Sequence, residues 1–170
     1  RNVKLITVDK LHIPIWGTFV TTPEVSTAKA EITLAVKINN HSSVKKSFVV
    51  TTHIINKQGK SVAQHAKKLS LKRGKNTKLI QSFEVNNPAL WDTVTPNMYQ
   101  AVTTITQNNK IVDEYITPFG IRSIEFSTKK GFLLNGKPTF MKGISIHHDG
   151  GLVGAAVPKG VWKRRFQTLK

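Results

Sequence analysis

The chain of 170 residues is 39% hydrophobic and contains no cysteine, so it can bury a core but cannot form a disulfide or a thiolate metal site. It nowhere approaches the roughly 18 consecutive apolar residues of a membrane-spanning helix, and we expect no contact with a membrane. The formal net charge is +17, and no acidic residue lies between Glu31 and Glu84. This basic stretch could attract nucleic acid or another polyanion. Because its lysines lack interleaved aromatic residues, we favour a solvated surface and do not expect nucleic-acid binding.

Short alternating segments dominate the first two thirds of the chain. In the clearest of them, residues 30–38, every second side chain is apolar, which predicts a strand with one buried face. Similar segments between turn residues predict further strands at residues 47–55, 62–71, 77–85, 98–106 and 111–117. Regularly spaced short strands without a helical period predict an all-β, immunoglobulin-like β-sandwich. Because the disulfide usual in such domains is absent, we expect Trp16, Trp91 and Phe48 to fill the core.

The pattern changes after Phe126. Asn135–Gly136 is a two-residue hairpin signal, and residues 143–146 form a predicted short strand that ends at His147. A glycine-rich loop follows, and Pro158 suits the first turn of a helix with one apolar face. A strand, a loop and a helix make the opening βα unit of a barrel, which one unit cannot close. The polar residues 127–130 mark the predicted domain boundary.

His147, His148 and Asp149 are the candidate site residues. Neighbouring strand residues point to opposite faces, so the two histidines do not favour binding of one metal ion, and we predict neither a metal nor a cofactor. A nucleophilic triad would need an activated serine, and the shared strand face of Ser145 and His147 is common by chance. Polar residues at the end of a first barrel strand instead face the mouth where barrel enzymes bind substrate. A hydrogen-bonded loop histidine is the structural alternative.

Glycoside hydrolysis uses two carboxylates about 5–9.5 Å apart. Asp149 is the only acidic residue after Glu125, so the second segment cannot form such a pair. The other acidic residues are scattered over the predicted sandwich, where we interpret them as surface or turn residues. Exposed aromatic platforms for sugar binding are expected to be scarce, because the core needs several of the few Trp and Tyr residues. We therefore predict no catalytic residue in this chain.

Several motifs in combination resemble glycoside hydrolase family 2, and its β-galactosidase branch in particular. The joining region carries three of them, at residues 119–126 (FGIRSIEF), 132–138 (FLLNGKP) and 142–149 (KGISIHHD). Residues 88–92 (PALWD) and 96–99 (PNMY) resemble a segment of the immunoglobulin-like domain of that family. Residues 16–23 (WGTFVTTP) resemble the first strand of the same domain.

The resemblance implies an immunoglobulin-like β-sandwich domain over residues 1–126 and the N-terminal fragment of a (β/α)₈ catalytic domain, a truncated first βα unit, over residues 127–170. It implies a non-catalytic part of a retaining glycosidase, in which the sandwich supports the barrel and later barrel strands supply the catalytic glutamates. His147, His148 and Asp149 would then line the substrate pocket. The expected partners are the remainder of that enzyme and its β-glycoside substrate, and segment 127–170 could also self-associate.

Two alternatives stay open. A β-glucuronidase-type parent fits the same motifs, because Ser145 and the loop after Asp149 leave the glycoside undetermined. An independent binding module would instead use the basic face on a polyanion, with an affinity that falls steeply as salt rises. The chain alone is predicted to be inactive. Its location is open, and a periplasmic or secreted bacterial enzyme is favoured.

Overall fold

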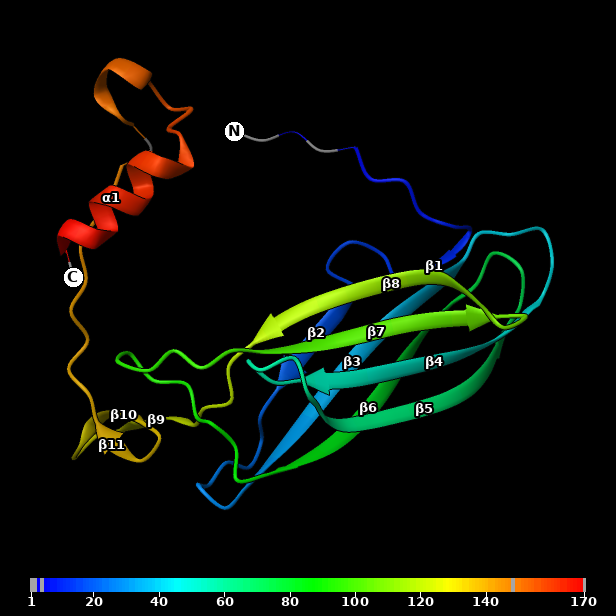
Figure 1. The fold of residues 1–170 in the computed structure, drawn as a ribbon, viewed down its shortest axis with the longest axis horizontal. Helices are drawn as coiled ribbons and strands as arrows, with labels where there is room; N and C mark the ends of the chain where they lie inside the picture. Colours follow the sequence, from blue (N-terminus) through cyan, green and yellow to red (C-terminus); the bar gives the residue numbers. More distant parts are fainter. Residues whose placement is uncertain (1–2, 4, 148, 170) are drawn as a thin grey trace. The chain divides into compact units, whose positions relative to one another are not determined.

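The chain divides into two compact units, Val8–Phe140 and a second that comprises Met141–Lys170 and Arg1–Thr7. The computed structural model describes residues 3, 5–147 and 149–169. Within these residues, every β-strand lies in Val8–Phe140 (Figure 1).

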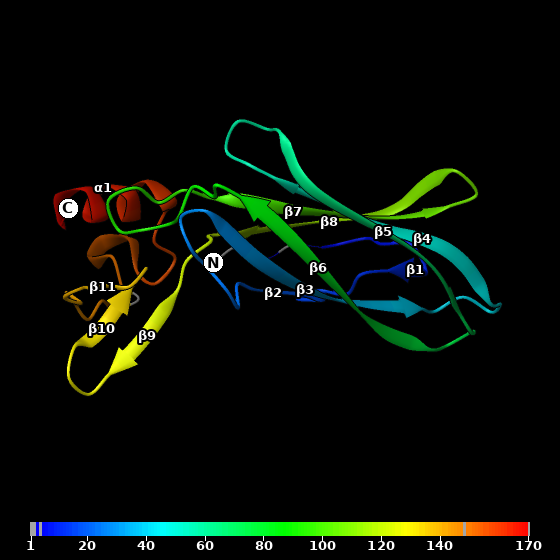
Figure 2. The ribbon, with the colours of Figure 1, turned by 90° about the horizontal axis from the view of Figure 1, so that it is seen from below.

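Antiparallel strands of Val8–Phe140 form two sheets that pack face to face (Figures 1 and 2). In the first sheet, β3 (Lys29–Asn40) pairs along one edge with β6 (Asn76–Asn86) and along the other with β1 (Leu11–His12) and β2 (Thr18–Thr21). The second sheet has the order β5-β4-β7-β8, with bounds Ser61–Leu71, Lys46–Ile55, Tyr99–Gln107 and Lys110–Phe119. The predicted all-β sandwich is confirmed.

The core follows from the period of two along the strands. On β3, the side chains of Ala30, Ile32, Leu34, Val36 and Ile38 are all buried, whereas the side chains between them are not. They pack with apolar side chains of β4, β6 and β7 in one core. Burial of each Val, Leu or Ile side chain stabilises the fold by roughly 1.5–3 kcal/mol. The buried side chains of β3 therefore contribute much of the stability of the sandwich.

A small polar network lies inside this apolar core. The Thr52 hydroxyl donates to Gln81 Oε1 at 2.7 Å and lies 3.0 Å from the Thr103 hydroxyl, and all three residues are buried. Gln81 Nε2 lies 3.1 Å from Nδ1 of His65. The network therefore links β4, β5, β6 and β7. Its groups avoid the desolvation cost of an unpaired buried polar group because they bond one another.

Tyr99 fixes the connection from β6 to β7. Its side chain is buried at the start of β7, and its hydroxyl accepts the N–H of Ala89, ten residues upstream, at 2.9 Å. A buried tyrosine that bonds back to the preceding connection in this way resembles the tyrosine corner described for immunoglobulin-like sandwiches. The ring also stacks on Phe119 of β8, with centroids 5.9 Å apart.

The aromatic residues predicted to fill the core differ in their burial. Phe48 is buried as expected, and Trp91 is half-buried. The prediction for Trp16 is wrong, because its side chain is 88% exposed. Leu11 and Ile13 are the residues that enter the core in this region, which leaves Trp16 on the loop between β1 and β2.

A small sheet follows the sandwich, with the order β11-β10-β9 and bounds Lys137–Pro138, Gly131–Leu134 and Ile124–Ser127. The Asn135–Gly136 hairpin is confirmed, because both residues have positive φ, 51° and 73°, between β10 and β11. Residues 128–130 form the turn between β9 and β10. The strands on either side of the predicted boundary are thus hydrogen-bonded to each other. Polar turns and polar linkers look alike in sequence, and the division into 1–126 and 127–170 stays a prediction.

The unit with Met141–Lys170 contains η1 (Gly151–Val153) and α1 (Lys159–Leu169). Pro158 directly precedes the helix instead of lying in its first turn, and its carbonyl accepts the N–H groups of Val161 and Trp162. The prediction of a strand at residues 143–146 is wrong, because residues 141–147 have no regular secondary structure. A barrel strand forms by hydrogen bonding to neighbouring strands, and among the described residues no strand pairs with this segment. The predicted first βα unit is therefore not confirmed.

Candidate functional site

The predicted site residues lie just before the glycine-rich loop. His147 is exposed, in a stretch without regular secondary structure. Asp149 is also exposed, and His148 lies outside the described residues. Because no strand ends at His147, sheet pairing does not direct its side chain. Its place in a substrate pocket stays a prediction.

Asp149 connects its own loop to α1. Its Oδ1 accepts the N–H of Gly151 at 3.2 Å, and its backbone carbonyl accepts Nη1–H of Arg165 at 3.0 Å. The Arg165 guanidinium also lies over the Trp162 ring, with Cζ 5.1 Å from the centroid. The Arg165 side chain thus contacts both the loop, at the Asp149 carbonyl, and the Trp162 ring on its own helix. The sequence analysis missed Arg165, although its i, i+3 spacing from Trp162 is a signal for such a pair.

An apolar hollow of about 400 Å³ lies between the extended segment and α1. Ile144 and Ile146 line it from the segment, and Leu169 lines it from the helix together with Thr168 and the arginine side chains. Ile144 and Leu169 are 61% and 56% exposed. Apolar surface of this kind suits contact with further protein, whereas the hollow offers no carboxylate for glycoside chemistry.

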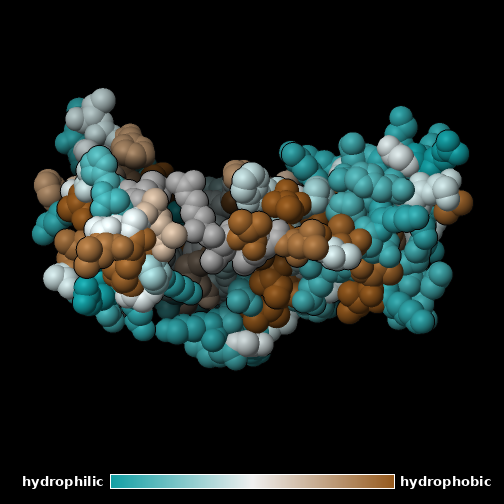
Figure 3. Space-filling model, turned by 90° about the horizontal axis from the view of Figure 1, so that it is seen from above, coloured by the Kyte–Doolittle hydropathy of each residue, from teal (hydrophilic) through white to brown (hydrophobic). Residues whose placement is uncertain are grey.

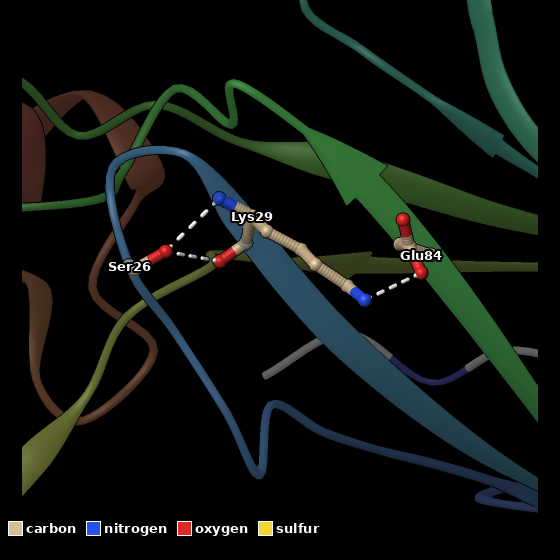
Figure 4. Close-up of polar contacts among 3 residues, drawn as sticks. All are labelled: Ser26, Lys29 and Glu84. Carbon is tan, nitrogen blue, oxygen red and sulfur yellow. Dashed lines mark hydrogen bonds and ion pairs between the residues drawn. The ribbon is translucent and has the colours of Figure 1, made fainter.

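The sandwich brings together a pair of carboxylates that spacing along the chain does not reveal. Glu31 and Glu84 lie opposite each other in the β3–β6 ladder, and Lys29 bonds Glu84 at 2.6 Å beside Ser26 (Figure 4). The hydrogen bond and charge of Glu84, with smaller effects of Glu31 and Glu24, raise the pKa of Lys29. Both carboxylates project from an exposed sheet face instead of flanking a cleft. We therefore interpret them as a surface charge cluster and not as a glycosidase pair.

A larger hollow of about 590 Å³ lies where β2 and β8 end. Met98 and Phe119 are among its apolar lining residues, and Arg122 is its charged one. The Arg122 guanidinium lies over the Trp91 ring, with Cζ 4.6 Å from the centroid, and its backbone carbonyl accepts the Thr22 hydroxyl at 2.8 Å. A hollow with one engaged cation and no lining carboxylate fits a contact surface better than a catalytic pocket.

Among the residues that the structure describes, no three His, Cys, Asp or Glu side chains gather closely enough to hold a metal ion. In the same part of the chain, no helix has the length and apolar character needed to cross a membrane.

The fold defines the class as a protein with a β-sandwich domain. The model of glycosyl hydrolases family 2 matches residues 12–122, which is more than half of the chain. The chain therefore belongs to glycosyl hydrolases family 2, and the resemblance seen in its motifs is confirmed.

Relatives in this family match almost the whole chain. The β-galactosidase BoGH2A of Bacteroides ovatus is 36% identical over 170 residues, which cover 100% of this chain and 20% of that protein. A β-glucuronidase of Formosa agariphila is 32% identical over 174 residues, covering 98% of this chain and 18% of the relative. A crystal structure of a family 2 member from Bacteroides cellulosilyticus DSM 14838 has a TM-score of 0.90 at 36% identity, over 94% of this chain and 22% of that one. The chain thus spans about one fifth of the length of these relatives.

Proposed function

We propose that the chain is a non-catalytic part of a retaining glycosidase of the β-galactosidase type. In this proposal the sandwich is an immunoglobulin-like domain that supports a (β/α)₈ barrel, and residues 127–170 begin that barrel. The observation that carries the proposal is the match to the Bacteroides ovatus β-galactosidase over all 170 residues, because it extends well beyond the family match at residues 12–122. The tyrosine corner at Tyr99 supports the immunoglobulin-like assignment.

The proposed role of the site segment is to hold substrate at the pocket wall. A retaining glycosidase needs a carboxylic acid to protonate the glycosidic oxygen and a carboxylate to attack the sugar, and other parts of the enzyme would supply both. A neutral imidazole can donate one hydrogen bond and accept another, so His147 would orient sugar hydroxyl groups beside His148. Asp149, already bonded to Gly151 and Arg165, would fix the loop that carries them.

A β-glucuronidase parent is the second candidate, and the match to the Formosa agariphila β-glucuronidase favours it. The two substrates differ in the configuration at C4 and also at C6, where a glucuronide carries a carboxylate and a galactoside carries a hydroxymethyl group. A glucuronidase pocket therefore needs a cation at that position. The described site does not distinguish the two, since Arg165 is already engaged by the Asp149 carbonyl and Trp162.

The test is hydrolysis of two aryl glycosides by the full-length enzyme and by the 170-residue chain. The full-length enzyme should prefer 4-nitrophenyl β-galactoside over the β-glucuronide by at least about tenfold in kcat/KM. The 170-residue chain should hydrolyse neither, because it lacks a carboxylate pair in a cleft. A preference for the glucuronide selects the second candidate. Inactivity of the full-length enzyme on both substrates, or turnover by the chain alone, contradicts the proposal.

In the same assay, His147→Gln in the full-length enzyme should lower kcat/KM roughly 5- to 150-fold, as expected when a buried hydrogen bond worth about 1–3 kcal/mol is lost. His41→Gln is the matched control, because His41 is exposed in the turn after β3, and it should leave kcat/KM unchanged. An unchanged value for His147→Gln would remove His147 from the pocket wall.

A further inference from the structure

Three connections between strands carry basic side chains to the same end of the sandwich. The β3–β4 connection carries Lys45, the β5–β6 connection carries Lys72, Arg73 and Lys75, and the β7–β8 connection is followed by Lys110. The strands β3, β5 and β7 all end there, at the right of Figures 1 and 2. Figure 3 shows mostly hydrophilic residues over this end. Basic residues that are spread along the sequence thus meet in space.

Asn40 ties two of these connections to each other. Its side chain is fully buried, and its Nδ2 donates to the carbonyls of Val44, Leu71 and Lys72 at 2.9, 3.0 and 3.2 Å. Its backbone N–H donates to the Lys75 carbonyl at 2.9 Å. These bonds use backbone atoms of the two lysines, so they fix the turns without occupying the ammonium groups.

The start of β1 and the β7–β8 connection are joined to the same end. The His41 N–H donates to the Lys10 carbonyl at 2.7 Å, which places Lys10 beside the β3–β4 connection. Lys46 Nζ donates to Gln107 Oε1 at 3.1 Å, which links the start of β4 to the end of β7. We give the name basic end to a set of exposed cations, Lys10, Lys45, Lys72, Arg73, Lys75 and Lys110.

Carboxylates do little to balance the charge of the basic end. Glu31 and Glu84 pair near the opposite ends of β3 and β6, and the one ion pair among the described residues, Lys29–Glu84, also lies there. Asp9 and Asp113 lie toward the basic end, but each carboxylate accepts a backbone N–H, at 2.8 and 2.7 Å. The cations of the basic end therefore repel one another. A fold that gathers like charges at a cost in stability offers a binding surface for the opposite charge.

The arrangement suits a linear polyanion better than one small anion. The β3–β4 and β5–β6 connections both cross between the two sheets, which in a sandwich lie about 10 Å apart, so the charges spread over the whole end. Lysine contributes a flexible point charge, which suits sulfate or carboxylate groups without fixing one geometry.

The neighbouring side chains favour a polysaccharide over a nucleic acid. The three connections contain no Trp, Tyr or Phe on which bases could stack. They do contain Ser43, Asn108 and Asn109, which are exposed and can form hydrogen bonds with sugar hydroxyl groups.

We propose that the basic end binds an anionic polysaccharide, a chain that carries sulfate or carboxylate groups. The inference rests on the proposed function, because a glycosidase benefits from holding a glycan away from the bond that it cleaves. Such a second contact raises the effective concentration of glycosidic bonds at the active site.

Acetylation of lysines, followed by mass spectrometry, tests the contact in the 170-residue chain and in the full-length enzyme. Saturating chondroitin sulfate should slow acetylation of Lys45, Lys72 and Lys75 at least about threefold, because bound anions cover the ammonium groups. Lys57 and Lys60 are the internal reference, since they are exposed in the β4–β5 turn at the other end of these strands. Equal protection of both sets, or no protection of the basic end in the full-length enzyme, would overturn the proposal.

Matched variants separate the basic end from the net charge. The test variant removes three charges from the basic end by Lys45→Gln, Lys72→Gln and Lys75→Gln. The control removes three exposed charges elsewhere by Lys57→Gln, Lys60→Gln and Lys129→Gln. At about 0.15 M salt, the test variant should bind chondroitin sulfate at least about tenfold more weakly than the parent, and the control less than about threefold more weakly. Equal losses would assign the binding to net charge alone and contradict the proposal.

The choice of polymer identifies the anion and the class of partner. Desulfated chondroitin that binds at least about tenfold more weakly assigns the contact to sulfate, and undiminished binding assigns it to carboxylate; either result supports the proposal. Tighter binding of duplex DNA, equal binding of neutral dextran, or no binding of either form of chondroitin would overturn it.

Hydrolysis of 4-nitrophenyl β-galactoside distinguishes this inference from the proposed function. The test variant of the full-length enzyme should keep its kcat/KM on this substrate, because a small neutral glycoside does not reach the basic end. Inactivity of the unmodified full-length enzyme would overturn the proposed function. Activity without chondroitin binding would overturn the polysaccharide contact alone.

Discussion

At the scale of single residues, the end of the sandwich depends on close contact between Gly120 and Trp91. A Cβ on Gly120 would lie 2.8 Å from Cβ and Cγ of Trp91. The Trp91 N–H donates to the Ile121 carbonyl at 2.8 Å, and the Trp91 carbonyl accepts Nδ2–H of Asn135 at 3.0 Å. Trp91 therefore ties the end of β8 to the hairpin turn of the small sheet, and it cannot move without disturbing both.

A Gly120→Ala variant should lower the free energy of unfolding by about 1–3 kcal/mol, because the added methyl group overpacks this contact. Urea denaturation followed by tryptophan fluorescence measures the change. Gly143→Ala is the control, since a Cβ there meets no atom within 4 Å, and it should change the free energy by less than about 0.5 kcal/mol. Equal effects for the two variants would show that the contact with Trp91 does not limit residue 120.

Residue type predicted burial well for Phe48 and poorly for Trp16. Hydrophobicity alone favours burial of both side chains. Trp16 lies in a turn closed by the hydrogen bond from the Gly17 N–H to the Pro14 carbonyl, and in this turn its side chain stays outside the core. Such a turn cannot be read from the apolar pattern, because the pattern carries no information on φ.

At the scale of elements, β3, β4, β6 and β7 could be predicted because each buries one face. The expected strand at residues 30–38 is β3, Lys29–Asn40, and only its ends differ. The structure extends it through Asn40, whose buried side chain donates to the carbonyls of Val44 and Leu71, a polar contact that periodicity does not reveal. The strand expected at residues 143–146 failed for another reason, since its formation depends on partner strands and not on its own sequence.

The loop between β6 and β7 is organised by Asp92. Its carboxylate accepts the N–H and hydroxyl of Thr95, the latter at 2.9 Å, and the N–H of Val94 at 2.8 Å. The hydrogen bonds from the Thr95 backbone and side chain, and then from Val94, hold the pKa of Asp92 below its usual value. A carboxyl group with a lowered pKa in the folded state stabilises the fold above its unfolded pKa. That contribution is lost as the pH falls through the folded value.

An Asp92→Asn variant should therefore melt at a lower temperature than the parent chain at pH 7, because the amide cannot accept all three bonds as a carboxylate does. The gap between the two melting temperatures should shrink as the pH falls below about 4, which a series of thermal melts would measure. Glu114→Gln, at an exposed position on β8, controls for the loss of one negative charge. A gap that stays constant down to pH 2 would show that the carboxylate does not organise the loop.

At the scale of the whole molecule, the net charge of +17 opposes folding through self-repulsion. Much of it lies on the sandwich, where Lys67 and Lys68 of the edge strand β5 are exposed. The one ion pair among the described residues joins Lys29 to Glu84, so direct pairing offsets little of the charge there.

The chain should consequently gain stability with salt, because the Debye length falls from about 30 Å at 0.01 M to about 10 Å at 0.1 M. We expect the melting temperature to rise by roughly 2–4 °C between these ionic strengths, about 1 kcal/mol for a chain of this size. A Lys67→Glu, Lys68→Glu double variant should show a smaller rise. A melting temperature that falls with salt would mean that attractive pairs dominate the surface.

The candidate site was less predictable than the fold, because its geometry depends on contacts between distant parts of the whole molecule. Motifs that include His147 identified the family, which the comparisons confirm. No strand ends at His147 in the structure, so its place in a substrate pocket stays a prediction. The bond from Arg165 to the Asp149 carbonyl was also hidden, because it joins a loop to a helix 16 residues later.

The buried hydrogen bonds among Thr52, Gln81 and Thr103 help to set the register in which β6 pairs with β3. If β6 slips by one residue along β3, Lys78 and Glu84 turn inward, and the alternation of apolar residues alone excludes that arrangement. A slip by two residues keeps the apolar side chains in the core, so the alternation of apolar residues does not exclude it. It would, however, place Leu79 or Phe83 where Gln81 meets Thr52, and would leave the buried amide of Gln81 without its partners Thr52 and His65, at a cost of about 1–3 kcal/mol. The alternation of apolar residues therefore disfavours a slip of β6 by one residue, and the hydrogen bonds among Thr52, Gln81 and Thr103 disfavour a slip by two residues.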